Sequence, residues 1–259
     1  MRYNTHQLQV RVNAINLLRQ GYRNLAVAAE LNVPRGTVGY WKHLDRERHP
    51  DLYPPSRWDS CPACHGYEVN DQPYAYLLGL YLGDGHIVRK YKQHTLSIAC
   101  ADAWPGLIDA AEEALRLVMP GATTGRVQRT GCTEVKSYSD HWVCMFPQHG
   151  PGKKHERPIV LEEWQEFVLE AHPEEFIRGL IHSDGCRSIN WTTRMIAGAK
   201  KRYEYPRYFF TNESEDIRDL FADTLDVLGI EWRYNNRNTI SIARRDSVAA
   251  LDAFVGPKY

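Results

Sequence analysis

Residues 77–85 read LLGLYLGDG, and residues 177–185 read IRGLIHSDG. Both stretches follow the same pattern: apolar, any residue, Gly, Leu, apolar, any residue, small, Asp, Gly. Their aspartates, Asp84 and Asp184, lie 100 positions apart (184 minus 84). Self-similarity at a fixed spacing indicates repeated copies of one structural unit. The sequence therefore predicts two related halves, each opened by one of these stretches.

Each stretch is expected to form an apolar helix that ends at its aspartate. The third position is glycine in both copies, Gly79 and Gly179, and a glycine there lets another backbone approach closely. The two helices can therefore pack against each other. Gly85 and Gly185 are expected to end the helices as C-caps.

This packing would bring Asp84 and Asp184 together at two helix C-termini. The helix dipole is negative there, so a carboxylate is disfavoured. Two carboxylates flanked by free terminal carbonyl oxygens would repel each other unless a divalent cation bound between them. Oxygen ligands alone suit magnesium or calcium. The repeat thus predicts a metal site at the interface of its two helices.

The paired motif resembles that of the LAGLIDADG homing endonucleases, and the resemblance spans residues 74–259. The chain departs from the family name at the sixth position, where Leu82 and His182 replace an aspartate that is not a ligand. Both eighth-position aspartates, which the resemblance identifies as metal ligands, are present. The resemblance implies an α+β fold of two pseudo-symmetric αββαββα repeats, about 74–172 and 173–259, with a saddle-shaped antiparallel DNA-binding sheet.

The predicted elements after each motif run strand, strand, helix, strand, strand, helix, as that fold requires. In the first half they are residues 86–92, 95–101, 105–119, 125–138, 142–146 and 161–171. In the second half they are residues 187–193, 208–211, 215–228, 232–235 and 239–243, closed by 247–254.

Residues 1–50 predict a separate all-α domain. Helical spacing gives a first helix with an apolar stripe of Leu8, Val12, Ile15 and Leu18, and a second over residues 25–31 that ends before Pro34. A third helix begins near Arg35 and places Val38, Trp41 and Leu44 on one face. A tight break between the second and third helices predicts a helix-turn-helix.

This segment resembles resolvase-like and sigma-like helix-turn-helix modules, with Ala26, Ala28 and Ala29 at the close helix crossing. Its last helix would project four side chains toward DNA: Arg35, Thr37, Tyr40 and Lys42. Residues 1–50 hold eight Lys or Arg and three Asp or Glu, which favours DNA over the alternative of a helical protein-binding module.

Residues 51–73 are rich in proline and are expected to link the two domains. Within them, Cys61 and Cys64 precede His65 with the spacing of c-type haem attachment, but haem ligation of this type needs an exported protein. The two thiols could instead hold zinc, with His65, His43, His49 or Cys100 as completing ligands. A turn with two buried thiols is the alternative. All six cysteines are expected to be reduced.

Charge is sorted by predicted element, although the net charge is zero. Basic residues gather on the predicted strands and their hairpins, whereas acidic residues gather on the helices. A sheet that is basic on one face would present a groove to duplex DNA. The side chains expected to contact DNA there are Arg89, Lys92, Arg126, Arg129, Lys136, Arg187, Arg194, Arg207, Arg233 and Arg237.

The resemblance implies an activity: magnesium-dependent hydrolysis of DNA phosphodiesters, one strand for each motif. Asp84 and Asp184, with the carbonyls of Gly83 and Ser183, would hold two or three magnesium ions at the motif interface. A basic residue beside each metal would help neutralise the transition state. Lys153 or Lys154 takes the family's usual place in the first half, and Arg244 or Arg245 is the counterpart in the second.

Two other functions share this fold: a non-cleaving transcription regulator that joins a helix-turn-helix to a degenerate repeat, and an RNA-splicing maturase. Regulators of that kind lose ligand carboxylates, whereas this chain keeps both. The duplex-reading first domain counts against a maturase. We expect neither a signal peptide nor a membrane helix, because the first residues lack an apolar run and no stretch approaches about 18 apolar residues. We therefore expect a cytoplasmic, nucleoid-associated monomer that binds double-stranded DNA and takes neither a membrane nor a small molecule as partner.

Overall fold

The computed structural model of the protein describes residues 8–53, 61–65, 69–90, 93–256 and 258. The chain divides into two compact units, Met1–Ser60 and Cys61–Tyr259. None of the helices among the described residues is long and apolar enough to cross a membrane.

The first unit is helical throughout its described elements, and its core is formed where the helices cross. The elements are α1 (Leu8–Arg19), α2 (Asn24–Glu30), α3 (Arg35–Arg48) and the 3-10 helix η1 (Pro50–Leu52). The buried side chains come from the three α-helices, from the turn before α3 and from the residue after η1: Ala14, Leu18, Val27, Ala28, Val33, Val38, Trp41 and Tyr53.

The buried stripe of α1 differs from the predicted one. Leu8 and Val12 are 77% and 41% exposed, whereas Ala14 and Leu18 are fully buried. Val10 and Leu17 pack against that pair. Residues 10, 14, 17 and 18 also have helical spacing, so periodicity alone could not choose between the two faces.

A tight turn separates α2 from α3, as the sequence predicts. Asn32 adopts a left-handed backbone conformation with φ of 49°, which asparagine tolerates better than most residues. Across the unit, the guanidinium of Arg19 donates two 2.8 Å hydrogen bonds to Asp45, and Tyr53 donates another of 2.7 Å. These bonds hold α1 against α3.

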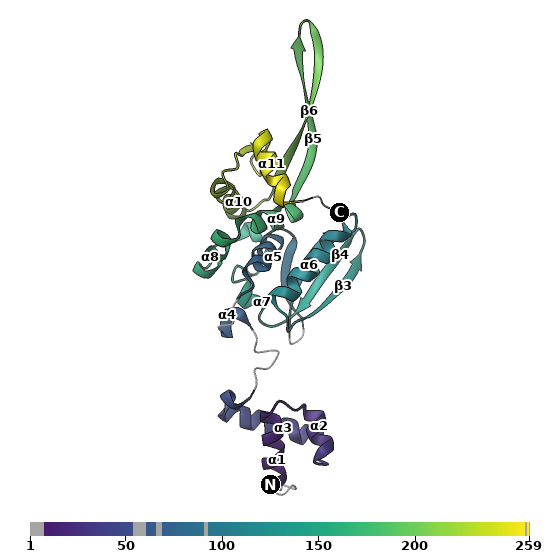
Figure 1. Ribbon diagram of the computed structural model, residues 1–259, viewed down its shortest axis with the longest axis vertical. Helices are drawn as coiled ribbons and strands as arrows, with labels where there is room; N and C mark the ends of the chain where they lie inside the picture. Colours follow the sequence, from purple (N-terminus) through teal and green to yellow (C-terminus); the bar gives the residue numbers. More distant parts are fainter. Residues whose placement is uncertain (1–7, 54–60, 66–68, 91–92, 257, 259) are drawn as a thin grey trace. The chain divides into compact units, whose positions relative to one another are not determined.

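The second unit repeats one arrangement twice, which confirms the predicted α+β repeat (Figure 1). The two antiparallel sheets have equivalent strand orders, β1-β2-β4-β3 and β5-β6-β8-β7. The first half contains α4 (Pro62–His65), α5 (Asp71–Asp84), β1 (Gly85–Lys90), β2 (Gln93–Ala101), α6 (Pro105–Val118), β3 (Thr123–Arg129), β4 (Cys132–Tyr138), α7 (Trp142–Met145), η2 (Lys154–Glu156) and α8 (Glu163–Ala171). The second half contains α9 (Pro173–Asp184), β5 (Gly185–Ile196), β6 (Ala199–Thr211), α10 (Glu215–Val227), β7 (Arg233–Asn236), β8 (Thr239–Ile242) and α11 (Arg245–Phe254).

Helices α5 and α9 pack against each other at the centre of this unit, through their glycines. A Cβ added to Gly79 would lie 2.6 Å from the carbonyl oxygen of Phe176, and one added to Gly179 would lie 2.2 Å from that of Tyr76. Real Cβ atoms do not approach backbone so closely, so only glycine permits this contact. Around it, residues 74–82 of α5 are all buried, which explains why that helix reads as apolar on every side.

Two predicted strands of the first half were wrong. Residues 125–138 form two strands, β3 and β4, because the chain turns at Gly131, whose φ is 79°. Residues 142–146 are not a strand but the short helix α7 with its C-cap. The three buried side chains there, Trp142, Met145 and Phe146, have the spacing of a helix face rather than strand alternation.

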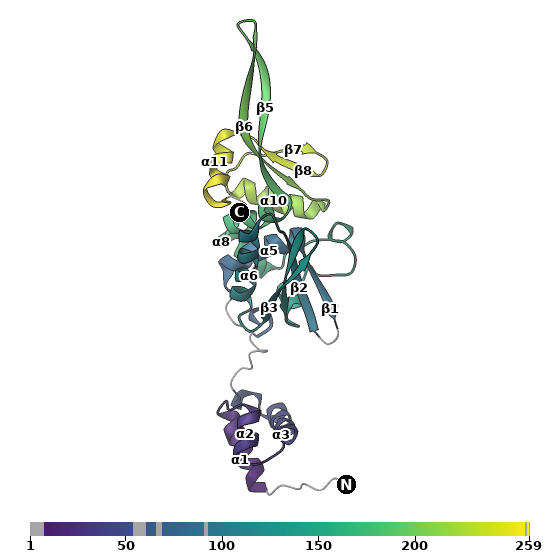
Figure 2. The same cartoon turned by 90° about the vertical axis from the view of Figure 1, so that its right-hand side faces the viewer.

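Strands β5 and β6 form a much longer hairpin than predicted. They pair continuously from Gly185 with Phe210 to Ile196 with Ala199, and the turn between them uses positive φ at Ala197 and Gly198. The outer part of the hairpin projects beyond α10 and α11 (Figures 1 and 2). Its side chains there are largely exposed, so it gives the second sheet a long arm without a core of its own.

Candidate active site

The two motif helices end side by side at their aspartates. A Cβ added to Gly83 would lie 2.1 Å from Oγ of Ser183 and 3.2 Å from Oδ2 of Asp184. The Ser183 hydroxyl turns back into its own helix, where it donates to the carbonyls of Gly179 and Leu180. The sequence motif thus places the ends of α5 and α9 in contact.

Gly85 and Gly185 follow the helices, as predicted, but not as left-handed caps. Their φ values are −85° and −98°, which is ordinary extended backbone. Glycine is needed there for space: a Cβ would lie 2.5 Å from Cα of Tyr81 at Gly85, and 2.6 Å from Cα of Ile181 at Gly185. In each half, the chain therefore passes directly from the motif helix into the first strand of the sheet.

The environment of Asp84 disfavours the ionised form of its carboxylate. Its carboxylate is solvent-exposed, yet the surrounding protein displaces much of its water, and this raises its pKa to about 6. The nearby negative charge of Asp184 raises the pKa further, whereas Lys154 and Lys258 oppose the rise. A bound cation would relieve this crowding of negative charge.

Asp184 is held more firmly than Asp84. Nδ2 of Asn212, just after β6, donates a 2.6 Å hydrogen bond to its Oδ2. Burial raises the pKa of Asp184, and this hydrogen bond opposes the rise. In the first sheet Ile98 pairs with Gly85 as Phe210 pairs with Gly185, so Cys100 occupies the position equivalent to Asn212. The two halves are therefore not electrostatically equivalent.

Lys154 is the basic residue of the first half that reaches the site. Its ammonium donates to the carbonyls of Tyr81, Leu82 and Gly83 at the end of α5, at 3.0 Å for Leu82 and 2.7 Å for Gly83. Burial lowers its pKa to about 8, and the two aspartates oppose that shift. Lys153, the alternative that the sequence left open, is exposed beside Glu156.

Lys258 is the basic residue of the second half that lies near the two aspartates, and the sequence reasoning missed it. Its ammonium donates a 2.6 Å hydrogen bond to the carbonyl of Gly185, and it interacts electrostatically with both aspartates. Burial lowers its pKa. Arg244, by contrast, is exposed and paired with Glu231 and Asp246. The spacing of 104 residues between the two lysines (258 minus 154) is close to the motif spacing and could have revealed Lys258.

The sixth motif position has a structural role in both copies. Leu82 is buried in the core. His182 is also buried, which lowers its pKa to about 4. The hydroxyl of Tyr76 lies 3.0 Å from Nδ1 of His182, and Nε2 lies 2.9 Å from the carbonyl of Val255. A neutral ring that accepts from Tyr76 and donates to Val255 satisfies both contacts, so His182 joins α5 to the end of α11.

An open cavity of about 450 Å³ lies over the helix ends. Its lining includes Gly83, Lys154, Asp184 and Asn212, and it extends to His86 on β1. The oxygen donors at the helix ends that could hold a cation are the two carboxylates, of which Asp184 lines this cavity, and the helix-terminal carbonyls. Such a donor set fits magnesium, manganese or calcium rather than a soft metal.

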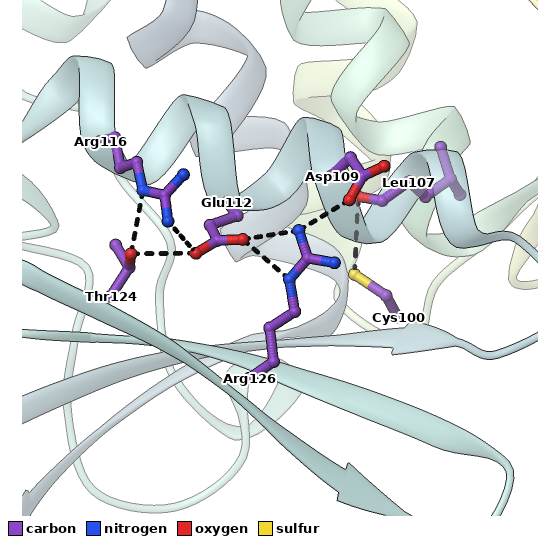
Figure 3. Close-up of polar contacts among 7 residues, drawn as sticks. All are labelled: Cys100, Leu107, Asp109, Glu112, Arg116, Thr124 and Arg126. Atoms are coloured by element: carbon purple, nitrogen blue, oxygen red, sulfur yellow. Dashed lines mark hydrogen bonds and ion pairs between the residues drawn. The ribbon is translucent and has the colours of Figure 1, made fainter.

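Two of the side chains predicted to contact DNA point toward the helices that cover the sheets. Arg126 on β3 reaches the helix layer, where it pairs with Asp109 and Glu112 of α6 (Figure 3). Arg187 on β5 donates two hydrogen bonds to Asp252 of α11. Strand alternation places both side chains on the helix side of their sheets, so the prediction that they face a DNA groove was wrong. Sorting charge by element could not separate the two faces of a strand.

Most of the other predicted contacts lie on the open faces of the sheets, but strand alternation puts Arg89 on the same face of β1 as the buried Ile87. Arg129 and Lys136 share Glu134, and Arg207 is buried with its guanidinium against Ser241. The remaining predicted contacts in the described part of the chain are exposed: Arg89, Arg194, Arg233 and Arg237. Lys92 lies outside the described residues.

The side chains predicted to project from α3 are accessible. Arg35 is exposed and Tyr40 is 60% exposed, while Thr37 and Lys42 are half-buried. The ammonium of Lys42 lies 6.0 Å from the ring centre of Tyr53.

Cys61 and Cys64 meet two residues that the sequence reasoning did not pair with them, His141 and Cys144. Of the completing ligands considered before, Cys100 is buried elsewhere and lies 3.9 Å from the carbonyl of Leu107. A scan for a second pair with the same two-residue spacer would have found His141 and Cys144.

Comparison with known proteins identifies the fold. No family profile matches the sequence, and no curated protein matches it. Among solved structures, the complex of I-DmoI with DNA and manganese has a TM-score of 0.50 at 15% identity, covering 73% of this chain and 99% of that one. A second similar structure is that of the LAGLIDADG meganuclease I-AabMI bound to uncleaved DNA, with a TM-score of 0.46 at 11% identity, covering 70% of this chain and 82% of that one. A third is that of the LAGLIDADG homing endonuclease I-GzeII in complex with its DNA target, with a TM-score of 0.44 at 12% identity, covering 74% of this chain and 85% of that one. The first of these likenesses shows that the chain has the LAGLIDADG homing-endonuclease fold.

Proposed function

We propose that the protein is a divalent-metal-dependent DNA endonuclease that cuts both strands of a duplex. One observation carries the proposal: two aspartates and two lysines, one of each from each half, meet at the ends of two packed helices. Like-charge pairs with shifted pKa values are a common feature of active sites. The fold supports this proposal because I-DmoI, which shares it, has been solved with DNA and manganese.

In this proposal Asp84 and Asp184, with the carbonyls of Gly83 and Ser183, hold magnesium. The cation would activate water and stabilise the leaving oxygen. Asn212 orients the Asp184 carboxylate. Lys154 and Lys258 carry positive charge next to the carboxylates and would offset the charge that develops on the phosphate.

The two sheets and the long β5–β6 hairpin would bind the duplex, with α3 of the first unit adding contacts as the recognition helix of a helix-turn-helix. Because both halves lie in one chain, a monomer would carry a complete site and would suit an asymmetric target. Such an enzyme would act on the nucleoid, in the cytoplasm.

A cleavage assay on the full chain tests this function. Supercoiled plasmid carrying the gene's native genomic flanks would be incubated with magnesium or without divalent cation. We expect linear product with the wild-type protein, and loss of at least about a hundredfold in rate in an Asp84→Asn, Asp184→Asn double variant. Asp223→Asn, on the exposed side of α10, is the matched control and should cut normally.

The same experiment separates the alternatives. Binding to the plasmid that depends on salt, without cleavage and unchanged in the double variant, would favour a transcription regulator. Binding that prefers folded RNA over duplex DNA would favour a maturase.

A further inference from the structure

A group of sulfur and nitrogen donors lies in the second unit, formed by residues outside the motif. Cys61, Cys64, His141 and Cys144 each offer one donor atom, and these four atoms all lie within 4.8 Å of one another. We propose that this cluster, the Cys3His cluster, binds one structural zinc ion. The proposal is independent of the function of the carboxylate site.

The local fold brings the four residues together in two matched pairs. Cys61 and Cys64 flank the start of α4, while His141 and Cys144 flank the start of α7. In each pair two residues separate the donors, so one helical turn directs both side chains to the same point. Structural zinc sites commonly combine two such pairs from separate parts of a chain.

The distances fit a tetrahedral ion. Sγ of Cys64 lies 3.2 Å from Nδ1 of His141, and Sγ of Cys144 lies 3.9 Å from the same nitrogen. Bonds of about 2.3 Å from zinc to sulfur and about 2.0 Å to nitrogen place tetrahedral ligands roughly 3.5 to 3.8 Å apart. The observed separations therefore bracket the required ones, and small side-chain rotations would complete the site.

The donor chemistry selects zinc over the cations that suit the aspartates. Thiolate and imidazole ligands bind zinc, whereas magnesium and calcium prefer oxygen. Four protein ligands leave no position for a substrate, so the ion would be structural. The three cysteines of the cluster are not joined in a disulfide.

The position of the Cys3His cluster indicates how a bound ion would stabilise the second unit. Cys61 is fully buried in the core of the second unit and begins that unit, and α7 contributes Trp142 and Met145 to the same core. An ion bound by all four residues would tie the first residues of this unit to a segment about 80 positions further along. Closing a loop of that length restricts the unfolded chain and so stabilises the fold.

Metal analysis of the purified full chain tests the proposal. We expect about one zinc ion per wild-type chain after growth with zinc, and at least about a fivefold loss in Cys64→Ser and in Cys144→Ser, as removal of a thiolate ligand weakens binding. Cys132→Ser, at the start of β4 and outside the cluster, is the control and should keep its zinc. Circular dichroism would show whether each variant is folded.

A spectroscopic measurement on the wild-type chain keeps the test decisive if the variants do not fold. Cobalt loaded in place of zinc should show the ligand-field and thiolate charge-transfer absorption of a tetrahedral site. Wild-type protein without zinc and without these bands would overturn the proposal, as would folded variants that both retain zinc.

Discussion

Nδ2 of Asn212 lies 2.6 Å from Oδ2 of Asp184, whereas the equivalent strand position beside Asp84 carries Cys100. The amide favours the ionised form of Asp184 and opposes the rise in its pKa. A carboxylate that an amide donor keeps ionised and oriented is better prepared to bind a cation than Asp84, whose pKa is raised to about 6. The two halves should therefore respond differently to the same loss.

Asn212→Ala should raise the pKa of Asp184 and weaken cation binding in the second half by roughly tenfold, as is common when a group that orients a metal ligand is removed. If the proposed function holds, one DNA strand will be cut more slowly and nicked plasmid will accumulate. Strand-specific labelling measures this, with Asn236→Ala on exposed β7 as the control. Equal slowing of both strands would contradict the asymmetry.

The raised pKa of Asp84 predicts how the stability of the cation-free protein depends on pH. Its folded pKa of about 6 exceeds its ordinary value of 3.8, so the folded chain binds this proton more tightly than the unfolded chain. The contribution of this group to stability is therefore present at low pH and is lost as pH rises through about 6. Asp84→Asn removes that loss.

We expect Asp84→Asn to stabilise the protein at pH 8 by on the order of 1 kcal/mol, a value reduced for solvent screening, and to have little effect at pH 4. Thermal denaturation without added divalent cation measures both. A variant that is less stable than wild type at pH 8 would show that Asp84 makes favourable contacts that outweigh the repulsion.

Lys154 and Lys258 should act on catalysis rather than on binding. Replacing either by methionine keeps most of the side-chain volume and removes the charge beside the carboxylates. We expect cleavage to fall by about a hundredfold, with duplex affinity changed by less than about threefold. Lys153→Met and Arg244→Met are the matched controls, since both residues are exposed and paired elsewhere. Full activity in Lys258→Met would show that Lys258 is not the basic residue that assists cleavage in the second half.

The sequence predicted the repeat, the two helix ends and the order of most elements, because glycine spacing and apolar runs are local signals. It could not predict Asn212. That residue lies 28 positions after Asp184, whereas Cys100 lies 16 positions after Asp84, because the β5–β6 hairpin is the longer one. The partners of a carboxylate across a sheet depend on hairpin length and register, which the sequence does not fix.

The faces of the strands were the second gap. Arg126 and Arg129 both lie on β3 and both looked like DNA contacts, but they are three positions apart, and an odd offset puts two side chains on opposite faces of a strand. Choosing the face requires knowing which neighbours are buried, and β3 is an edge strand with few buried residues. A basic strand therefore indicates a DNA surface only after its register is known.

That distinction can be measured with two arginine variants. Arg126→Ala breaks its pairs with Asp109 and Glu112, so we expect lower stability, by about 1 kcal/mol, and an unchanged salt dependence of duplex binding (Figure 3). Arg194→Ala removes an exposed charge from the hairpin arm and should weaken binding and reduce the salt slope by about one, with stability unchanged. The reverse pattern would mean that Arg126, not Arg194, faces the DNA.

Gly79 tests the contact on which the whole site depends. A methyl group at this position would lie 2.6 Å from the carbonyl oxygen of Phe176 and 2.7 Å from the backbone nitrogen of Leu180, so α5 and α9 must separate to admit it. Neither atom belongs to a flexible side chain, and the resulting strain should cost about 2 to 3 kcal/mol despite the better helix propensity of alanine. Gly125→Ala is the matched control, because a Cβ there meets no atom within 4 Å. Chemical denaturation of the two variants gives the difference in their free energies of unfolding directly.

The same separation of α5 and α9 would also move Asp84 away from Asp184. We therefore expect the pKa of Asp84 to fall in Gly79→Ala, because the negative charge of Asp184 would raise it less. A pKa that stays near 6 in this variant would mean that the helix ends remain in contact after the glycine is lost.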